Sequence, residues 1–261
     1  MRERVCVLAS GSSGNCTFVS ADGVSILVDA GISGRETERR LEEIGEDPGR
    51  LRAICVSHEH TDHTAGIGVL HRRYATPLFA NSGTINGIGR QRGLAGLPWN
   101  VFTTGQPFQI GTLQIEPVSV PHDAYDPVGF IIRSSTAAIG VVTDMGMATA
   151  LIRTRLRDCD ALVIETNHDE TMLQNAQRPW MLKQRIMGRQ GHLSNRQAAA
   201  VIEEIAGPRL KQIFLAHISS DCNEAWRAEQ EIRQTVEHAG LAHIQIACTF
   251  PDRISAVWQP A

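Results

Sequence analysis

The stretch His58-Glu59-His60-Thr61-Asp62-His63 decides how the rest of the chain is interpreted, because it places three imidazoles and a carboxylate within six consecutive residues. In an extended segment the side chains of His58 and His60 leave the same side of the backbone, since side-chain direction alternates with a period of two. Asp62 and His63 then face a second point, where the chain turns. Imidazole is a ligand for zinc, iron or copper, and a carboxylate supplies a hard oxygen ligand. This hexad can therefore offer two ligands to one metal ion and two to its neighbour.

The residues on either side of the hexad indicate a loop between a strand and a helix. Residues 51–57, LRAICVS, form an apolar run that predicts a buried strand, and an apolar helix is expected from about Thr64 to Arg73. Loops held by rigid strands and helices carry much of the binding and catalytic chemistry of proteins. We therefore interpret the hexad as a metal site and not as a histidine-rich surface turn.

Four further polar residues stand where apolar runs end. Asp29 follows VSILV, His122 follows LQIEPVSVP, Asp144 follows AAIGVVT and His217 follows KQIFLA. Any one of them alone would most often be a loop residue or a helix cap. Four of them together with the hexad argue against a chance arrangement.

The hexad and these four residues resemble the signature of the metallo-β-lactamase fold. Within that superfamily, the segments VLASGSSGNCTFV, ETNHDETML, GHLSN and LAHISSDCN are similar to the YycJ-like (WalJ-like) group, whose members are thought of as phosphodiesterases or nucleases acting on DNA. The resemblance covers nearly the whole chain. It implies an α+β fold, a four-layer αββα sandwich, with residues 1–261 as a single domain and the site where loops from both halves meet.

Length and composition suit such a fold. The chain has 261 residues, of which 42% are hydrophobic, enough to bury a sizeable core. We see no apolar run long enough to span a bilayer and no export signal, so we expect a cytoplasmic protein without a membrane partner. The six cysteines form no CxxC pair and lie mostly in apolar runs, so free thiols are expected rather than disulfides.

The resemblance also carries metal ligands over to this chain. The family pattern assigns two sets of three ligands, His58, His60 and His122 for one divalent ion, and Asp62, His63 and His217 for a second. Asp144 would bridge the two ions, and Asp29 would accept a ring N–H and so orient a histidine. Zinc, manganese or iron would suit these ligands, with zinc or manganese favoured.

Two such cations would lower the pKa of water, so that a bridging hydroxide is the expected nucleophile, and they would neutralise charge that grows on a phosphoryl oxygen. Asp62 is therefore counted among the catalytic residues as well as among the ligands. Oxygen-reducing relatives carry a carboxylate where this chain has His60, and β-lactam-cleaving relatives use a cysteine ligand that has no counterpart here. Hydrolysis is thus favoured over redox chemistry.

Phosphodiester cleavage also needs an acid that protonates the departing alkoxide, and His192 in GHLSN is the candidate. Glu165, at the end of ALVIE, would keep it protonated, because a neighbouring carboxylate raises a histidine pKa. This pair resembles the acid dyad of RNase Z-type relatives, although His192 could instead cap the helix that begins near Asn195. His168 would either bind phosphate or fix Glu165, and Asn223 is expected to cap the last long helix.

The charge distribution gives a further hint. The net charge of −3 does not point to a nucleic-acid binder, but no acidic residue occurs between Glu170 and Glu203. That stretch contains a basic strip, which we define as Arg178, Lys183, Arg185 and Arg189. Such a strip suits a phosphate backbone, and arginine makes forked phosphate contacts. A solvated helix face would explain the same residues, and both interpretations stay open.

We therefore expect a metal-dependent hydrolase of phosphodiester bonds, and specifically a DNA exonuclease. A hydrolase of small, for example cyclic, phosphodiesters would need the same metals and the same acid. A thioester or lactone hydrolase would need neither the acid nor the basic strip, and the complete ligand set argues against a non-catalytic metal-binding protein. The stretch from Asp144 to His217 is too short for a large cap domain, so an open site is expected. The sequence does not decide the oligomeric state.

Overall fold

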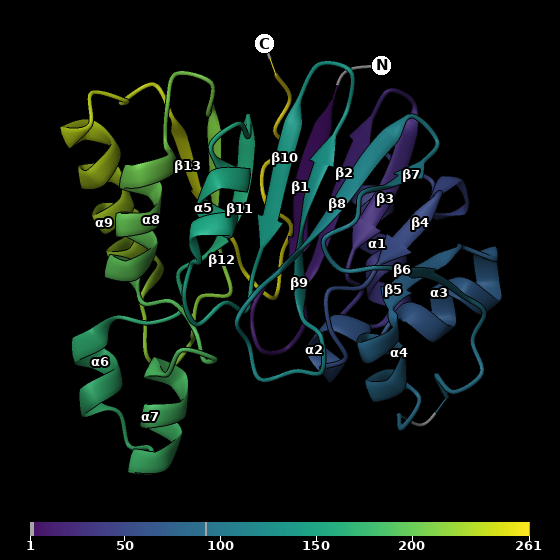
Figure 1. Cartoon of the computed structure of the whole chain (residues 1–261), viewed down its shortest axis with the longest axis horizontal. Helices are drawn as coiled ribbons and strands as arrows, with labels where there is room; N and C mark the ends of the chain where they lie inside the picture. The colour runs from purple at the N-terminus through teal and green to yellow at the C-terminus, as the bar shows by residue number, and fades with distance from the viewer. Residues whose placement is uncertain (1–2, 92, 261) are drawn as a thin grey trace.

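The computed structural model describes residues 3–91 and 93–260, which form two packed β-sheets with helices on both outer faces (Figure 1). The first sheet contains, in order, β1 (Arg4–Ala9), β2 (Cys16–Ala21), β3 (Val24–Val28), β4 (Ala53–Cys55), β5 (Leu78–Asn81) and β6 (Trp99–Phe102). The second sheet contains, in spatial order, β13 (Gln245–Cys248), β12 (Gln212–Ala216), β11 (Ala161–Glu165), β10 (Ala138–Val142), β9 (Val128–Arg133), β8 (Leu113–Ser119) and β7 (Phe108–Ile110).

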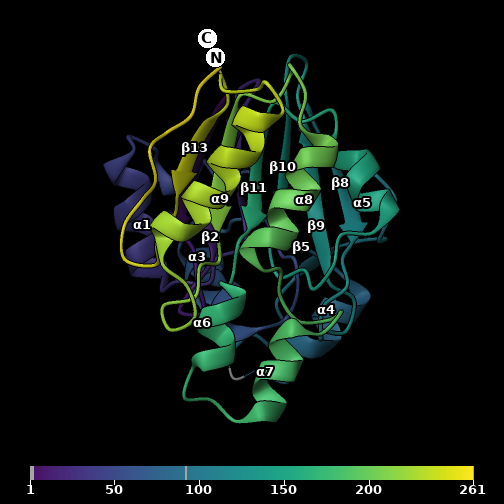
Figure 2. The same ribbon diagram turned by 90° about the vertical axis from the view of Figure 1, so that its left-hand side faces the viewer.

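The helices divide between the two halves of the chain. The first half carries α1 (Gly34–Glu43), α2 (Thr61–Thr64), α3 (Ile67–Tyr74) and α4 (Ser82–Ile88), and a short 3-10 helix at Pro48–Arg50. The second half carries α5 (Ala150–Leu156), α6 (Glu170–Asn175), α7 (Trp180–Met187), α8 (Asn195–Ile205) and α9 (Ala225–His238). Figure 2 shows α8 and α9 side by side over the outer face of the second sheet.

Each sheet joins an antiparallel part to a parallel part. In the first sheet β1, β2 and β3 pair antiparallel, whereas β3, β4, β5 and β6 pair parallel. In the second sheet β7 to β10 pair antiparallel, whereas β10 to β13 pair parallel. The carboxyl ends of parallel strands meet at one edge of a sheet, and in open sheets such an edge is where ligands bind.

Four layers require three apolar interfaces, and alternation along the strands supplies them. In β11, Ala161 and Val163 lie in the core between the sheets, whereas Leu162 and Ile164 pack against the core under α5, α8 and α9. A third core lies between the first sheet and its helices. The αββα sandwich implied by the resemblance is therefore confirmed.

The helix expected after the hexad is present as α3, but it begins at Ile67 and not at about Thr64. A short helix that was not predicted, α2, precedes it. The break falls near Gly66, whose backbone N–H donates to the Ala30 carbonyl oxygen at 2.7 Å. A Cβ at Gly66 would lie 2.4 Å from the carbonyl oxygen of Ile32, so the segment after β3 crosses this point only because a glycine stands there.

The segment with α6 and α7 extends from the second half beyond the strand ends (Figure 1). None of the residues of α7 is buried among the described parts of the chain. Nor does any helix in residues 3–91 and 93–260 have the length and apolar character needed to cross a bilayer. All six cysteines are free thiols, as expected, and only Cys248 is not fully buried.

Candidate metal centre

The candidate site lies where parallel strands of both sheets end. Asp29 follows β3 and the hexad follows β4, while Asp144, Glu165 and His217 stand at the ends of β10, β11 and β12. Asp29, Asp144 and His217 have φ values of 61°, 52° and 54°, in the left-handed region that non-glycine residues seldom occupy. Backbone strain of this kind persists where the surroundings enforce it, and it clusters at functional sites.

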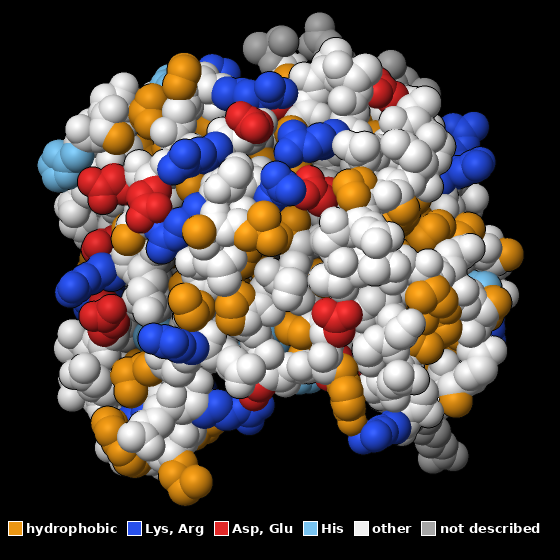
Figure 3. All heavy atoms as spheres, in the orientation of Figure 1, with side chains coloured by type: hydrophobic (Ala, Val, Ile, Leu, Met, Phe, Trp, Pro, Cys, Tyr) orange, Lys and Arg blue, Asp and Glu red, His pale blue; other side chains and the backbone are white. Residues whose placement is uncertain are grey.

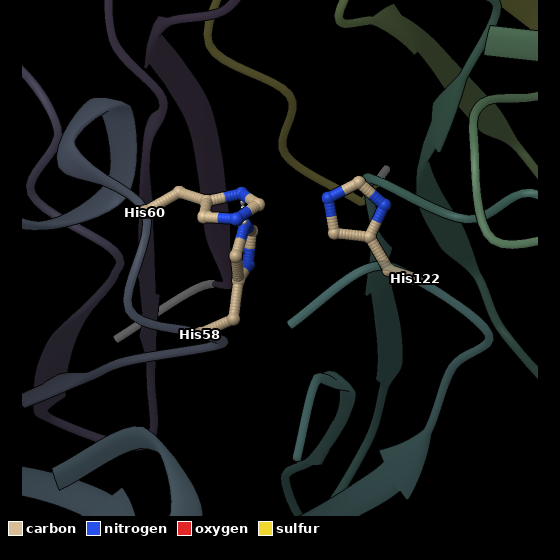
Figure 4. Close-up of side chains that lie close together, drawn as sticks. All are labelled: His58, His60 and His122. Carbon is tan, nitrogen blue, oxygen red and sulfur yellow. Dashed lines mark hydrogen bonds between the residues drawn. The ribbon is translucent and has the colours of Figure 1, made fainter. Parts of the chain in front are cut away.

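Three histidines from both halves form the first cluster. His58 and His60 come from the loop after β4, and His122 reaches them from the opposite side, from the loop after β8 (Figure 4). One ring nitrogen of each lies within 4.8 Å of the others. His58 Nε2 and His60 Nδ1 are 3.1 Å apart. The structure thus brings together the first predicted ligand set.

Asp144 joins this cluster to the second predicted set. Its Oδ2 lies 3.1 Å from His63 Nε2, and its Oδ1 lies 3.4 Å from His217 Nδ1 and 4.0 Å from His122 Nε2. Asp62 Oδ2 lies 3.6 Å from His63 Nε2 and 3.8 Å from His217 Nε2. The residues predicted for two ions therefore surround one carboxylate.

Four of these histidines share one arrangement. A hydrogen-bond acceptor faces the Nδ1 atom of the ring, and the Nε2 atom points towards the other site residues. The pairs are His58 with Ser57 Oγ (3.0 Å), His63 with Asp29 Oδ2 (2.8 Å), His122 with the carbonyl oxygen of Gly191 (3.2 Å) and His217 with Glu165 Oε1 (3.0 Å). A hydrogen bond at Nδ1 fixes the tautomer and leaves the lone pair at Nε2, the form that binds a metal ion. The role expected for Asp29 agrees with its contact to His63.

The site contains buried carboxylates whose negative charge is not balanced by lysine or arginine in the part of the chain that the structure describes. Asp29, Asp144 and Glu165 are at most 3% exposed, and no lysine or arginine in the described residues pairs with them. Asp144 Oδ2 and His217 Nε2 are buried, and neither has a hydrogen bond of acceptable geometry to another described residue. Buried charges are costly unless they are paired or bind metal ions. The donor set therefore fits divalent metal ions.

Titration behaviour follows the same pattern. Burial would raise the pKa of Asp144, but the adjacent His217 and His63 outweigh burial and hold this pKa well below its usual value. Burial lowers the pKa of His58 and His122, which favours neutral rings. Burial would also lower the pKa of His63 and His217, but the adjacent Asp144 carboxylate outweighs burial and raises both. Metal binding needs neutral imidazoles, so it would release the protons of these two rings.

The candidate acid pair is formed as expected. His192 Nδ1 lies 2.7 Å from Glu165 Oε1, and Glu165 Oε2 accepts hydrogen bonds from the backbone N–H groups of Met145 (2.8 Å) and Leu193 (3.2 Å). Burial lowers the pKa of His192, but the Glu165 carboxylate outweighs burial and raises it to about 9. Sequence reasoning missed that Glu165 also holds His217, since this depends on the register that sets Glu165 beside Ala216.

The N-cap residues of α8 and α9 test two other interpretations of the sequence, which concern His192 and Asn223. Ser194 caps α8 with a complete capping box, so His192 is free of that role. The prediction that Asn223 caps the last long helix was wrong, because the N-cap residue is Glu224 and has no side-chain cap bond. The Asn223 amide instead exchanges two hydrogen bonds with Asn195, at 2.8 and 2.9 Å.

His168 is buried beside the acid pair, but no hydrogen bond joins its ring to Glu165 within the described residues. Its Nδ1 is buried without a partner there, and its carbonyl oxygen accepts from the Asn195 N–H at 2.9 Å. Burial lowers the pKa of His168, so the neutral ring is favoured. No described contact supports the role in fixing Glu165, and the role in phosphate binding stays a prediction.

Sequence reasoning missed two residues that hold the hexad. Ser57 Oγ donates to Asp29 Oδ2 at 2.8 Å. Asn15 Nδ2 lies 3.0 Å from His63 Nε2, and the Asn15 N–H donates to the Asp62 carbonyl oxygen at 2.7 Å. Gly31 permits this contact, since a Cβ there would lie 1.6 Å from that same oxygen. The only sequence signal was the glycine-serine loop SGSSGN, residues 10–15, which resembles an anion-binding turn.

The basic strip lies beside the site but is partly neutralised. Arg178 and Arg185 each pair with an aspartate, Lys183 Nζ donates to the Gln174 carbonyl oxygen, and Arg189 is exposed. Figure 3 shows the lower edge of the molecule hollowed between the lobe with α6 and α7 and the opposite lobe. Arginines 178 and 185 also line a pocket at His192.

Comparison with known proteins adds independent findings. Residues 25–218 match the family model described as beta-lactamase superfamily domain. The chain is 34% identical over 238 residues to exodeoxyribonuclease YycJ of Bacillus anthracis, across 90% of this chain and 89% of the relative. It is 36% identical over 220 residues to exodeoxyribonuclease WalJ of Streptococcus pneumoniae, across 83% and 82%. Among solved structures, the metallo-beta-lactamase fold protein YhfI from Bacillus subtilis superimposes with a TM-score of 0.75 at 16% identity, across 99% of this chain and 100% of that one.

Proposed function

This chain belongs to the beta-lactamase superfamily domain family, and on that premise we propose that it is a DNA exonuclease that hydrolyses phosphodiester bonds with two divalent metal ions. Two relatives that align over most of their length are named exodeoxyribonucleases. The observation that carries the proposal is the position of Asp144, whose single carboxylate lies within 4.0 Å of His63, His122 and His217.

The ligand assignment follows from the two clusters around Asp144. His58, His60 and His122 would hold one ion, and Asp62, His63 and His217 would hold the other. Asp144 Oδ2 lies near His63 of the second cluster, and Oδ1 lies near both His122 of the first cluster and His217 of the second. The carboxylate thus contacts both clusters, which suits a bridging ligand. Such a pair of ions, when bound, lowers the pKa of water and neutralises charge on a phosphoryl oxygen. Zinc or manganese suits these imidazole and carboxylate donors.

His192 would protonate the departing oxygen. Glu165 holds Nδ1 of its ring, so the N–H at Nε2 remains available for transfer to the substrate. The side chain of His192 is 21% exposed whereas that of Glu165 is fully buried, so the histidine is the member of the pair that can reach a substrate. Glu165 keeps the imidazole protonated at neutral pH, since its carboxylate raises the pKa of His192 to about 9.

DNA is favoured over a small phosphodiester because of the surface around the site. No domain covers the strand ends in the described residues, and α7 places Arg185 beside the opening. Phosphate contacts by arginine supply much of the affinity of nucleic-acid binding. A hydrolase of small phosphodiesters would need no such surface and is the alternative outcome of the test below.

Metal analysis of the purified protein, followed by timed digestion of duplexes labelled at the 5′ or the 3′ end, tests the proposal. With added Mn²⁺ or Zn²⁺ we expect mononucleotides to be released progressively from one end. Internal cuts would contradict the exonuclease assignment. Turnover of bis(p-nitrophenyl) phosphate without any cleavage of DNA would support the small-substrate alternative instead.

A further inference from the structure

A pocket of about 210 Å³ is lined by His192 and by Leu182, Arg185 and Ile186 of α7. One wall comes from the α7 segment and the other from loops that follow site residues. The polar lining side chains include Arg178, Arg185, Ser12, Asn167 and Ser219, with Asp123 as the acidic member. The pocket is therefore rich in hydrogen-bond donors directly beside the proposed acid.

Both arginines of this pocket already have a carboxylate partner. Arg178 Nη2 lies 2.6 Å from Asp221 Oδ2, and Arg185 Nε lies 2.6 Å from Asp123 Oδ2. Asp123 directly follows His122. The α7 segment is thus tied to the loops around the metal centre through two arginine–aspartate pairs.

These pairs are weak enough to be exchanged. The Asp221 side chain is 61% exposed and the Arg185 side chain is 64% exposed. Ion pairs in contact with water contribute little net stability, because solvent and salt screen them. No residue of α7 is fully buried, so the helix that carries Arg185 is not fixed in a core.

A phosphate group is a better partner for these arginines than an aspartate. It offers more acceptor oxygens and more charge, and its geometry matches the guanidinium fork. The hydroxyl hydrogens of Ser12 and Ser219 have no acceptor among the described residues and can add two further bonds. The pocket thus supplies the charge and the donors that a phosphate needs.

We propose that this pocket is a second phosphate subsite, in which Arg178 and Arg185 exchange Asp221 and Asp123 for the phosphate next to the scissile one. The inference rests on the proposed function and deepens it. It assigns the substrate to polynucleotides, because a cyclic or single-phosphate ester has no second phosphate to place there.

Dinucleotides that differ by one phosphate test the subsite. Thymidylyl-thymidine is compared with the same dinucleotide phosphorylated at its 5′ end or at its 3′ end. For wild-type protein we expect one phosphorylated form to exceed the unphosphorylated one in kcat/KM by about tenfold, as charge-assisted bonds imply. Arg178→Ala and Arg185→Ala should each bring this ratio close to one. Arg233→Ala, which removes an exposed arginine of α9 paired with Glu229, should leave the ratio unchanged.

The variant Asp221→Asn distinguishes an exchange of arginine partners from a purely structural role of the Arg178–Asp221 ion pair. If Arg178 merely anchors the α7 segment, this variant should weaken substrate binding as Arg178→Ala does. Exchange predicts the opposite, a KM for the favoured phosphorylated dinucleotide that is several-fold lower, because the competing carboxylate is gone. A higher KM in Asp221→Asn would overturn the proposal.

The outcomes also separate the subsite from the proposed function. Equal cleavage of all three dinucleotides by wild-type protein contradicts the subsite alone. Failure to cleave any of them, together with failure on labelled duplex DNA, contradicts the proposed function and the subsite with it.

Discussion

The two halves of the molecule build their shares of the site in different ways. The first half places four candidate ligands in residues 58–63, within one loop after β4. The second half spreads its residues from His122 to His217, with about one at each strand end. A local turn forms the first group, whereas the second group exists only after β10, β11 and β12 have paired in register. A motif search finds the first arrangement easily, and only the folded chain explains the second.

The halves also differ in where their carboxylates lie. In the first half Asp62 is partly exposed and Asp29 holds His63, whereas Asp144 of the second half lies buried against histidines of both clusters. The buried carboxylate that faces both proposed ions therefore comes from the half whose residues are dispersed. Substitutions in the two halves should accordingly have different effects.

Asp144→Ala should impair the site most severely, because this carboxylate contacts His63 of the first half and His217 of the second. We expect kcat/KM to fall by about 10³-fold or more and at least one bound ion to be lost. Metal analysis and the duplex assay measure both. Asp158→Ala, at an exposed position, is the control. Full turnover in Asp144→Ala would refute the bridging role.

His192→Ala should remove the proposed acid, which belongs to the second half, and leave metal binding intact. Loss of a general acid costs about 10²–10⁴-fold in turnover of DNA, whereas bound metal should be unchanged. With bis(p-nitrophenyl) phosphate the loss should be much smaller, because its leaving group departs without protonation. His238→Ala on the exposed face of α9 serves as control. Equal losses on both substrates would argue against an acid at this position.

Asp29→Asn tests the hydrogen-bond support of the first half. The Asp29 carboxylate accepts from the Ser57 N–H and hydroxyl, both at 2.8 Å, and fixes His63. Removing such support typically weakens metal affinity by about 10- to 100-fold. Titration against a competing chelator measures the change, with Asp252→Asn at an exposed site as the reference. Unchanged affinity would mean that His63 needs no such partner.

Glu165→Gln should shift the pH dependence of the second half. The protonated form of His192 exists below its pKa of about 9, so activity on DNA should decline as the pH rises through this value. Without the Glu165 carboxylate the main cause that opposes burial is lost, so the pKa of His192 falls and the alkaline limb of the pH–rate profile should move to lower pH. A fall of one pKa unit would reduce turnover at pH 9 by about fivefold, and each further unit by about tenfold more. Metal content must be followed in parallel, because Glu165 also contacts His217. An unshifted limb would contradict the pairing.

How much of the site could be predicted from sequence follows from the same contrast. The hexad and its strand-to-loop setting were readable because the spacing of the residues is local. Asp144 and His217 were placed by resemblance, which names positions but gives no distances. The contact of Glu165 with both His192 and His217 could not be predicted, since it depends on how β11 and β12 align.

The support that Asn15 and Gly31 give to the hexad could not be predicted from the sequence either. Asn15 contacts Asp62 although 47 positions separate them, and Gly31 allows the approach by lacking a side chain. The glycine-serine loop marks the region of Asn15, but neither residue type nor spacing indicates that this residue contacts Asp62. The split between α2 and α3 escaped prediction for the same reason, since it depends on a backbone contact between Gly66 and Ala30.

The shared carboxylate of Glu165 has a thermodynamic consequence. Because His192 and His217 both hydrogen-bond to Oε1, proton uptake by one ring and cation uptake by the other are coupled through the same oxygen. Coupling of this kind is reciprocal: a cation on His217 would make His192 more acidic, and a proton on His192 would loosen the cation by the same factor. Removing the proposed ion would therefore also alter the proposed proton donor, so metal occupancy and the acidity of His192 could not be adjusted separately.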